Sequence, residues 1–389
     1  MKKLFFTALL VCVVAGVYGQ KKVLKDAEKA FKKGEYAEAY MLATKAAADA
    51  ETKDNPETHI VLGKSKLFQF QANIDNFILA QEANDHFAKA IELGGEEVKV
   101  DLMVSTVLNG EGKFLGGGDG IALLLELLNN AGNAAFEKDD FENAYHYYSL
   151  SAQNQDNIVL DFYAGYTAYA SKMFDEAVTF YGKVIQSAEE DFENTGFAYN
   201  GLIDIYMQKE DLDSALVFIK MAQVKFPEDR VYKDYEIDVL IQADKMGEAI
   251  EGLKKTVAEG QANAQNYYTL AYLQWNNGNN ADALASALKA LEIEPDLGDA
   301  LYIAGSAYFN QGADLLKEAN EIDDNDAYEA KKKEGIERLK LALPYFEKSL
   351  EINPEDLYSM RPLSTIYDQL DMDEKRDVIL AKIEAIEGR

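Results

Sequence analysis

Small residues recur at a fixed interval along this chain. In NNADALASALKALEIEPD (279–296) they share one helical face, and Pro295 ends the segment. Ala215, Ala249 and Ala283 are spaced 34 residues apart. Helix propensity alone does not dictate where alanine falls, so this placement indicates that another helix packs closely there. The pattern predicts a series of helices with the same packing surface.

A second apolar pattern precedes each alanine segment. It combines aromatic residues with a leucine or isoleucine beside a small residue, as in YNGLIDIY (199–206), YYTLAYLQW (267–275) and LYIAGSAYF (301–309). We therefore expect units of two helices, each helix about 20 Å long. Helices this short are marginally stable alone, so stacking of the pairs must supply the stability. The best-matched units begin near Ile158, Gly196, Arg230, Ala264 and Gly298.

These units resemble the tetratricopeptide repeat, a helix–turn–helix of 34 residues with the pattern W-x2-L-G-x2-Y…A-x3-F…P. Looser matches occur at 32–47, 83–95 and 138–152. The resemblance implies an all-α fold, a right-handed α-solenoid of about eight stacked helix-turn-helix repeats. The chain would then divide into repeats at 20–108 and 121–356 and capping helices at 357–389.

Close helix crossings require small residues. We predict that Gly165, Ala271 and Gly305 serve this role on first helices, and that Ala177, Ala215, Ala249 and Ala283 do so on second helices. Lys233 and Glu236 replace expected apolar residues, so the first helix of the unit at 230–263 should pack less tightly.

Residues 313–337 form an insertion in the repeat pattern. We expect it to lengthen both helices of one pair, with a turn near Asp323–Asp326, and to project by roughly 18 Å. Pro344 should interrupt and kink the returning helix, because proline cannot complete the helical hydrogen-bond ladder.

A glycine-rich stretch, NGEGKFLGGGDG (109–120), should not be helical. We interpret it as a flexible loop between two parts of the array. A phosphate cradle is disfavoured, because the G-x-x-x-x-G-K-[ST] spacing and a preceding strand are both missing from the pattern.

The first 19 residues have the composition of a secretory signal peptide. Lys2 and Lys3 precede an apolar run that ends in small residues, and we place cleavage after Gly19. An uncleaved anchor and lipid attachment at Cys12 are alternatives, although the small residue expected before a lipidated cysteine is replaced by Val11. We expect export to the periplasm or cell surface of a Gram-negative bacterium, with no membrane span after signal cleavage.

The formal net charge is −29. Such a surface repels phosphate backbones and anionic lipids, which argues against nucleic-acid binding. The charge either keeps the protein soluble or attracts a basic partner or divalent cations.

No catalytic, metal-binding or cofactor-binding motif is recognisable. His59, His86 and His146 are isolated in sequence, and metal-site spacings such as H-E-x-x-H are missing. The acidic segment 321–329 lacks the glycine and spacing of a calcium loop. We therefore expect a protein that is not an enzyme and that needs neither a cofactor nor a metal.

The concave face implied by the repeat resemblance is the candidate binding surface. The outward stripe of the first helices is rich in aromatic rings and amides, which commonly anchor binding sites. Its residues are Phe162, Tyr166, Tyr169, Asn200, Asp204, Asp234, Asp238, Tyr268, Tyr272, Trp275, Asn276, Tyr302, Phe309 and Asn310. The competing interpretation is that individual rings fill the gaps between helices.

The same resemblance suggests a protein-interaction scaffold. The family's basic clamp for a partner's carboxylate needs Lys and Arg, which are missing from this stripe, so we expect neutral or basic peptide partners. An alternative is a glycan-binding protein or an enzyme that uses the aromatic groove, with Tyr272 and Trp275 as stacking platforms.

Overall fold

A computed structural model describes residues 21–104, 106–108, 114–187 and 192–388. The expected signal segment and Cys12 lie outside these residues. The chain forms two compact units, Met1–Phe218 and Ile219–Arg389, which are described separately below. Their division falls inside helix α10, Leu212–Lys225. The repeat and cap boundaries expected from the sequence stay predictions.

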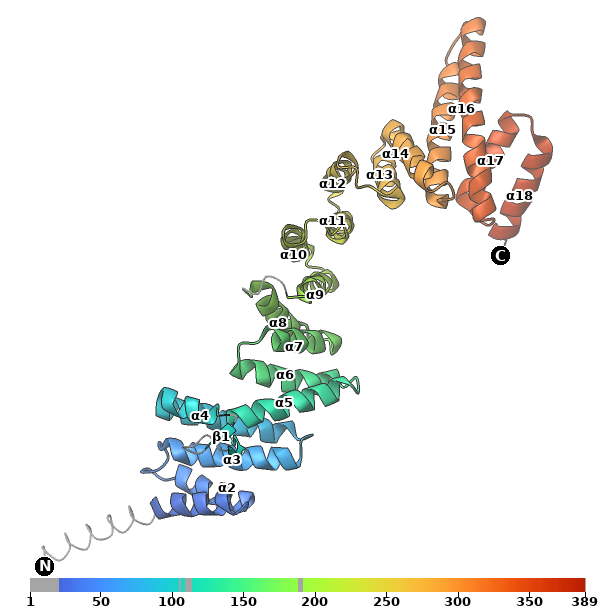
Figure 1. Ribbon diagram of the computed structural model, residues 1–389. Coiled ribbons are helices and arrows are strands. Elements are labelled where there is room, and N and C mark those ends of the chain that lie inside the picture. Colours follow the sequence, from blue (N-terminus) through green and yellow to red (C-terminus); the bar gives the residue numbers. More distant parts are fainter. Residues whose placement is uncertain (1–20, 105, 109–113, 188–191, 389) are drawn as a thin grey trace, which may run out of the picture. The chain divides into compact units, whose positions relative to one another are not determined.

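The first unit is built of consecutive helices that pack against their neighbours in the chain (Figure 1). Residues 21–32 are helical. They are followed by α2 (Tyr36–Ala47), α3 (Pro56–Ala72), α4 (Phe77–Leu102), α5 (Ile121–Phe136), α6 (Phe141–Asn154), α7 (Ile158–Ala170), α8 (Phe174–Gln186) and α9 (Thr195–Gln208).

The second unit continues the same architecture, and its two longest helices precede the last pair (Figure 1). Its helices are α11 (Val231–Gln242), α12 (Met246–Ala258), α13 (Ala264–Asn276), α14 (Asn280–Ile293), α15 (Gly298–Ala319), α16 (Asn325–Ile352), α17 (Leu357–Gln369) and α18 (Asp373–Glu387). The helix starts confirm the repeat units predicted from the sequence, and the all-α repeat architecture is confirmed. Its handedness stays a prediction.

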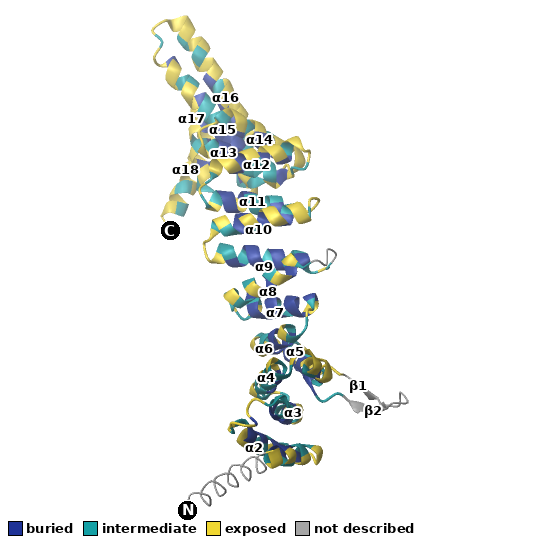
Figure 2. Cartoon of the chain, turned by 90° about the vertical axis from the view of Figure 1, so that its left-hand side faces the viewer, coloured by how far each residue is buried: buried dark blue, intermediate teal, exposed yellow. Residues whose placement is uncertain are grey.

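The predicted crossing residues are buried. Ala177, Ala215, Ala249 and Ala283 are all fully inaccessible. Figure 2 shows the buried positions on the sides of the helices that face neighbouring helices, with exposed positions on the outside. Stability therefore comes from burying one apolar face of each helix against the next pair.

Glycines admit large rings where helices approach most closely. Tyr181 of α8 packs against Gly165 of α7 and Gly201 of α9. Phe346 of α16 packs against Gly305 of α15 in the same way. A methyl group on any of these glycines would meet the ring at or below ordinary contact distance. The close-packing role predicted for Gly165 and Gly305 is thus confirmed.

The turn inside most helix pairs contains one residue in the left-handed region. These residues are Gly34, Asp139, Lys172, Glu210, Asp244, Gly278 and Asp371, with φ between 55° and 79°. Each follows the end of a first helix, where a left-handed residue lets the chain reverse and pairs the last carbonyl groups. Only two of the seven are glycine, so sequence alone gave little sign of this shared conformation.

The glycine-rich stretch is only partly as expected. Of its described residues, those of strand β2 (Phe114–Gly117) pair with β1 (Thr106–Leu108) in a two-stranded antiparallel hairpin between α4 and α5. The expectation of a flexible loop is therefore wrong for residues 114–117, which are extended and paired. Extended glycine-rich segments can pair through their backbone groups, which the side-chain pattern does not reveal.

The insertion lengthens α15 and α16, as predicted. Its turn lies at residues 320–324, slightly earlier than expected, because Asp324 caps α16 by accepting a hydrogen bond from the Ala327 N–H (2.9 Å). Gly312 and Gly335 bring the two backbones together, since a Cβ on either glycine would lie 3.0 Å from the other's carbonyl oxygen. The helix pair is therefore closely packed at its base.

The predicted interruption at Pro344 does not occur. Helix α16 continues through this residue to Ile352, so proline removes one backbone donor without ending the helix. Packing against α15 and α17 supports the helix on both sides of that position.

Lys233 and Glu236 are compatible with packing because their polar groups have partners. Lys233 Nζ lies 2.7 Å from Glu259 Oε2 and donates to Gln261 Oε1 (2.6 Å). Glu236 Oε2 accepts from Gln223 Nε2 (2.8 Å). Polar ties thus replace the apolar contacts that the repeat pattern expects here.

Candidate functional site

An aromatic pocket of ≈360 Å³ lies on the first helices of the second unit. Helices α13, α15 and α17 supply its walls. Its lining residues are Trp275, Tyr302, Ser306, Phe309, Asn310, Tyr358, Arg361, Pro362 and Thr365. Four of these residues were predicted from the sequence: Trp275, Tyr302, Phe309 and Asn310. The repeat spacing therefore located the pocket on two of its three helices.

Tyr302 is the centre of the aromatic group. Its ring centroid lies 5.9 Å from that of Trp275 and 6.3 Å from that of Tyr358, both in edge-on arrangements. A third edge contact joins it to Phe346 (6.2 Å), which anchors the group to the core. Such edge-to-face packing fixes the rings and leaves Tyr358, 73% exposed, free to meet a partner.

Sequence reasoning missed Tyr358, Arg361 and Pro362 because α17 was interpreted only as a terminal cap. A usable signal existed. Tyr358 follows Pro354 by the same four residues that separate Asp299 from Pro295. Counting from Pro354 would have placed α17 on the same face as the preceding first helices.

Arg361 gives the pocket a cation that the predicted stripe lacked. Its Nη2 lies 2.6 Å from Glu387 Oε1 of α18, and both side chains are largely exposed. The ion pair cancels the local charge, although exposed pairs of this kind are weak. The expectation that the stripe lacks basic residues is therefore wrong for α17, which carries Arg361.

The neighbouring part of the same face is acidic. Asp234 Oδ1 of α11 accepts from Asn266 Nδ2 of α13 (2.9 Å). The pKa of Asp238, one turn further along α11, is raised by burial and by the nearby Asp234 carboxylate. The two carboxylates thus make the local electrostatic potential more negative.

Tyr268 and Tyr272 stand on α13 with ring centroids 6.3 Å apart. Burial, followed by the nearby Asp299 carboxylate, raises the pKa of Tyr268. Tyr272 is 42% exposed, and Asn276, one turn further along, is exposed as well. The acidic and aromatic side chains therefore occupy neighbouring first helices.

The predicted residues of the first unit have different roles. Phe162 is 6% exposed and belongs to the core between α7, α8 and α9, so its assignment to the binding surface is wrong. Tyr166 is half-buried against Phe136 and Phe141. The longer reach of an aromatic side chain let Phe162 fill a gap between helices, which its position on the stripe did not reveal.

Tyr169, Asn200 and Asp204 lie on α7 and α9. The Tyr169 hydroxyl donates to the Asp204 carboxylate, which also accepts from Gln208 Nε2 (2.5 Å). Burial and this hydrogen bond raise the pKa of Tyr169 to about 12. Tyr169 and Asp204 are thus tied to one another rather than directed toward a partner, whereas Asn200 Oδ1 is buried with no hydrogen-bond partner among the described residues.

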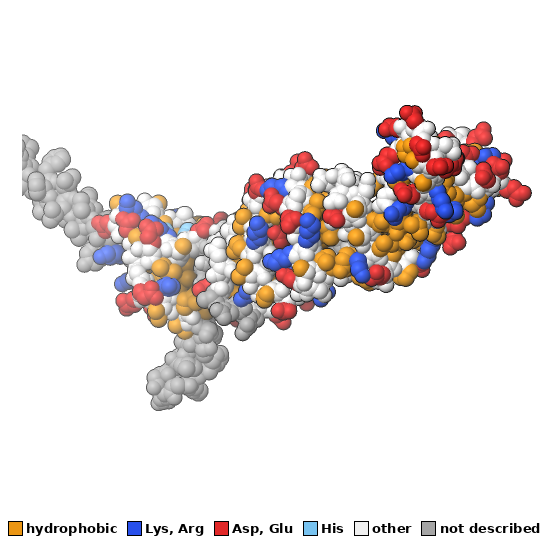
Figure 3. Space-filling model, turned by 90° about the horizontal axis from the view of Figure 1, so that it is seen from above, with side chains coloured by type: hydrophobic (Ala, Val, Ile, Leu, Met, Phe, Trp, Pro, Cys, Tyr) orange, Lys and Arg blue, Asp and Glu red, His pale blue; other side chains and the backbone are white. Residues whose placement is uncertain are grey.

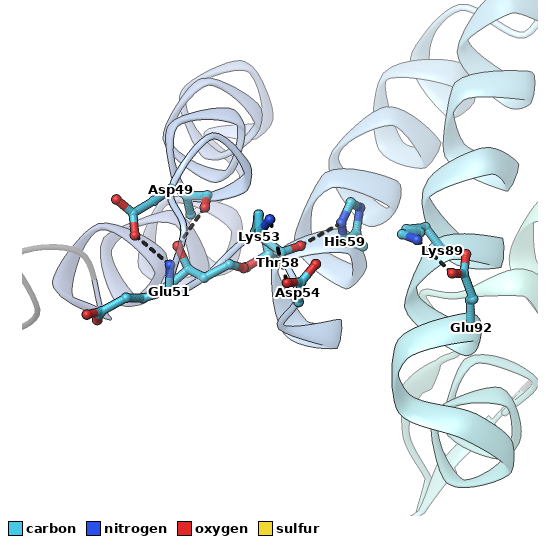
Figure 4. A network of polar contacts seen from close by, with 10 residues as sticks. Asp49, Glu51, Lys53, Asp54, Thr58, His59, Lys89 and Glu92 are labelled. Carbon is cyan, nitrogen blue, oxygen red and sulfur yellow. Dashed lines mark hydrogen bonds and ion pairs between the residues drawn. The ribbon is translucent and has the colours of Figure 1, made fainter.

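His59 and His86 are distant in sequence but meet in the first unit. Their ring centroids, on α3 and α4, are 5.7 Å apart. Figure 4 shows His59 directed at the Lys53 carbonyl in the preceding loop, with His59 Nε2 at 3.2 Å from that oxygen. His146 instead stacks on Phe77 (5.1 Å), so it is a packed residue and not a simple surface histidine.

Within the described ranges, no three His, Cys, Asp or Glu side chains are grouped to hold a metal ion. Lysines and arginines are interspersed with acidic side chains on the face shown in Figure 3. Among the described helices, none combines the length and apolar character required to cross a bilayer.

Comparison with known proteins gives one family match. Residues 264–297 match the model described as "Tetratricopeptide repeat". No curated protein is similar enough in sequence to be counted as a relative.

Several solved structures are similar to the chain. A tetratricopeptide-repeat protein from Cytophaga hutchinsonii, in its C-terminal part, is 15% identical over 67% of this chain and 95% of its own, with a TM-score of 0.48. One from Bacteroides fragilis is 18% identical over 63% and 98%, with a TM-score of 0.32. YrrB is 18% identical over 54% and 92%, with a TM-score of 0.40.

The family match coincides with α13 and α14, the pair whose alanines prompted the repeat assignment. Alanines equivalent to Ala283 recur 34 residues apart at Ala249 and Ala215, and all three are buried in successive helix pairs. The segment 264–297 is thus a tetratricopeptide repeat, and the alanines before it repeat its 34-residue spacing.

Proposed function

We propose that this protein is a non-catalytic interaction scaffold that binds an extended protein segment on the first helices of its second unit. Repeat arrays present extended surfaces of this kind to their partners. The observation that carries the proposal is the aromatic pocket around Tyr302, whose volume of ≈360 Å³ falls within the range of ligand-binding pockets.

The side chains of this pocket suit a peptide. Exposed tyrosine and tryptophan rings supply contact area with little loss of side-chain entropy. Ser306, Asn310 and Thr365 add hydroxyl and amide groups that can pair with a peptide backbone. Aromatic anchors surrounded by adaptable polar groups are typical of protein-binding surfaces.

We further propose that the protein acts in the cell envelope of a Gram-negative bacterium, after removal of residues 1–19. The basic start, the short apolar run and the small residues before Gln20 support export. A glycan-binding role for the same rings is the second candidate, because exposed aromatic faces can also stack on sugars.

Trp275 is the only tryptophan of the chain and lines the pocket, so its fluorescence reports occupancy directly. We would titrate the full chain with an arrayed nonapeptide library and with an equivalent panel of oligosaccharides. A saturable change with peptides, lost in Tyr358→Ala and kept in Leu380→Ala, is expected. Leu380 is an exposed apolar residue of α18 outside the pocket.

A saturable response to sugars alone would replace the peptide proposal with the glycan alternative. Equal losses in Tyr358→Ala and Leu380→Ala would show that the pocket is not the binding site.

A further inference from the structure

Several carboxylates on the described first helices of the second unit lack a cationic partner, and three of them lie on the helices on either side of α13. Asp234 and Asp238 lie on α11, and Asp299 lies in the first turn of α15. Among residues 219–388, no lysine or arginine nitrogen lies within the 4.0 Å of an ion pair to these three. By contrast, Asp296, three residues before Asp299, is paired with Lys348 (2.6 Å).

Aromatic rings lie on the helix between these carboxylates. Tyr268 and Tyr272 are one turn apart on α13, and Asp299 is close enough to Tyr268 to perturb its ionisation. The Asn266–Asp234 hydrogen bond ties α13 to α11 on this side. A lysine or arginine placed over a tyrosine ring is attracted by its π electrons, and neighbouring carboxylates strengthen that attraction.

The cation of the aromatic pocket is already paired, unlike the three carboxylates on the neighbouring part of the face. Arg361 is the only lysine or arginine in its lining, and Glu387 of α18 is paired with it. A partner carboxylate would have to compete with Glu387 for the guanidinium group. A partner cation meets no such competition at Asp234, Asp238 or Asp299.

We propose that this face selects a basic protein segment, whose lysine or arginine lies on Tyr268 and Tyr272 and pairs with the Asp234, Asp238 and Asp299 carboxylates. Glu387 contributes to the selectivity by shielding Arg361 from acidic segments. This inference rests on the proposed function, because it names the charge class of the partner that binds the same face.

The length of the segment follows from the fold. Asp234 and Asp238 on α11 are three helix spacings from Arg361 on α17, along the first helices α11, α13, α15 and α17. With neighbouring helices packed 8–10 Å apart, the distance is about 30 Å, which an extended chain covers with about nine residues. Nonapeptides are therefore the appropriate probes.

The test uses the tightest binders from the nonapeptide library, each remade with its basic residues changed to glutamine or to glutamate. Affinities for the full chain are measured by fluorescence anisotropy at low and high salt. We expect the affinity to be highest for the basic peptide, lower for its glutamine version and lowest for its glutamate version. High salt should weaken binding of the basic peptide only. Asp234→Asn with Asp238→Asn should weaken the basic peptide about fivefold to tenfold and leave the glutamine peptide unchanged.

A matched control removes the same charge elsewhere. Glu321→Gln with Asp323→Asn changes two exposed carboxylates in the turn between α15 and α16. This control should leave every affinity within about twofold. Glu387→Gln should strengthen binding of the glutamate peptide about threefold, and adding Arg361→Gln should cancel that gain.

Three results would overturn the inference. These are equal effects of the two double variants, tighter binding of the glutamate peptide to the native chain, or binding with no charge preference. The last result would leave the proposed function intact. If no library peptide changes Trp275 fluorescence, the proposed function itself fails.

Discussion

Gly201→Ala tests the close packing that holds the first unit together. Tyr181 of α8 is 2% exposed and lies between Gly165 of α7 and Gly201 of α9. A Cβ on Gly201 would approach Tyr181 Cδ2 and Cζ to 3.0 Å, with a third ring atom closer still. The opposite side of the ring is also confined, because a Cβ on Gly165 would lie 2.8 Å from Cδ1. The ring therefore cannot move away freely.

Two effects of opposite sign determine how much Gly201→Ala changes the free energy of unfolding. Overpacking a core position costs about 1–3 kcal/mol. Alanine favours a helix over glycine by up to about 1 kcal/mol. The net expectation is a loss of roughly 1–2 kcal/mol, which corresponds to a fall in Tm of about 2–8 °C for a unit of this size.

Gly182 provides a matched control because it follows Tyr181 on the same helix. A Cβ at this position would meet no atom within 4 Å, so Gly182→Ala should stabilise the protein by about 0.5–1 kcal/mol. Both variants are compared by thermal and urea unfolding, followed by circular dichroism. In a Tyr181→Leu background, Gly201→Ala should cost at least about 0.5 kcal/mol less than in the native chain.

The reasoning is refuted if Gly201→Ala is as stable as Gly182→Ala. A Gly201→Ala cost that persists unchanged without the Tyr181 ring would also refute it.

Three other predictions concern separate features. Ala249→Leu should destabilise the second unit by about 1–3 kcal/mol, because Ala249 is fully buried at a helix crossing. The measurement is urea unfolding, and an unchanged urea midpoint would contradict the assignment of Ala249 to a helix crossing. Asp244→Gly should stabilise by about 0.5–1 kcal/mol, because Asp244 has φ of 57°, and the same assay on Gly278→Ala should show a change of opposite sign. Burial and the neighbouring His59 lower the pKa of His86 below its usual 6.5, so the folded state favours the neutral ring. Stability from this ring should be complete above about pH 6.5 and decline as pH falls toward the lower folded-state pKa, a slope that urea titrations of His86→Gln should lack.

The repeat and much of its packing follow from the order of the amino acids alone. Small residues can share one face at a 34-residue interval only if successive helix pairs meet in the same way, so the spacing alone is enough to assign Ala249 and Ala283 to helix crossings. The same spacing put Trp275 and Phe309, 34 residues apart, on a common surface, because equivalent positions in stacked pairs lie side by side.

Which side chains of that surface are buried and which line a pocket depends on contacts that form only in the folded chain. Phe162 and Trp275 occupy equivalent faces in sequence, yet one is in the core and the other lines a pocket. The difference depends on which rings and glycines lie opposite them, and these come from other helices. Arg361 and Glu387 meet for the same reason, since their separation in the chain says nothing about the packing of α17 on α18. Helical periodicity is a local property that one segment carries alone, whereas the exposure and charge of a site depend on contacts between segments.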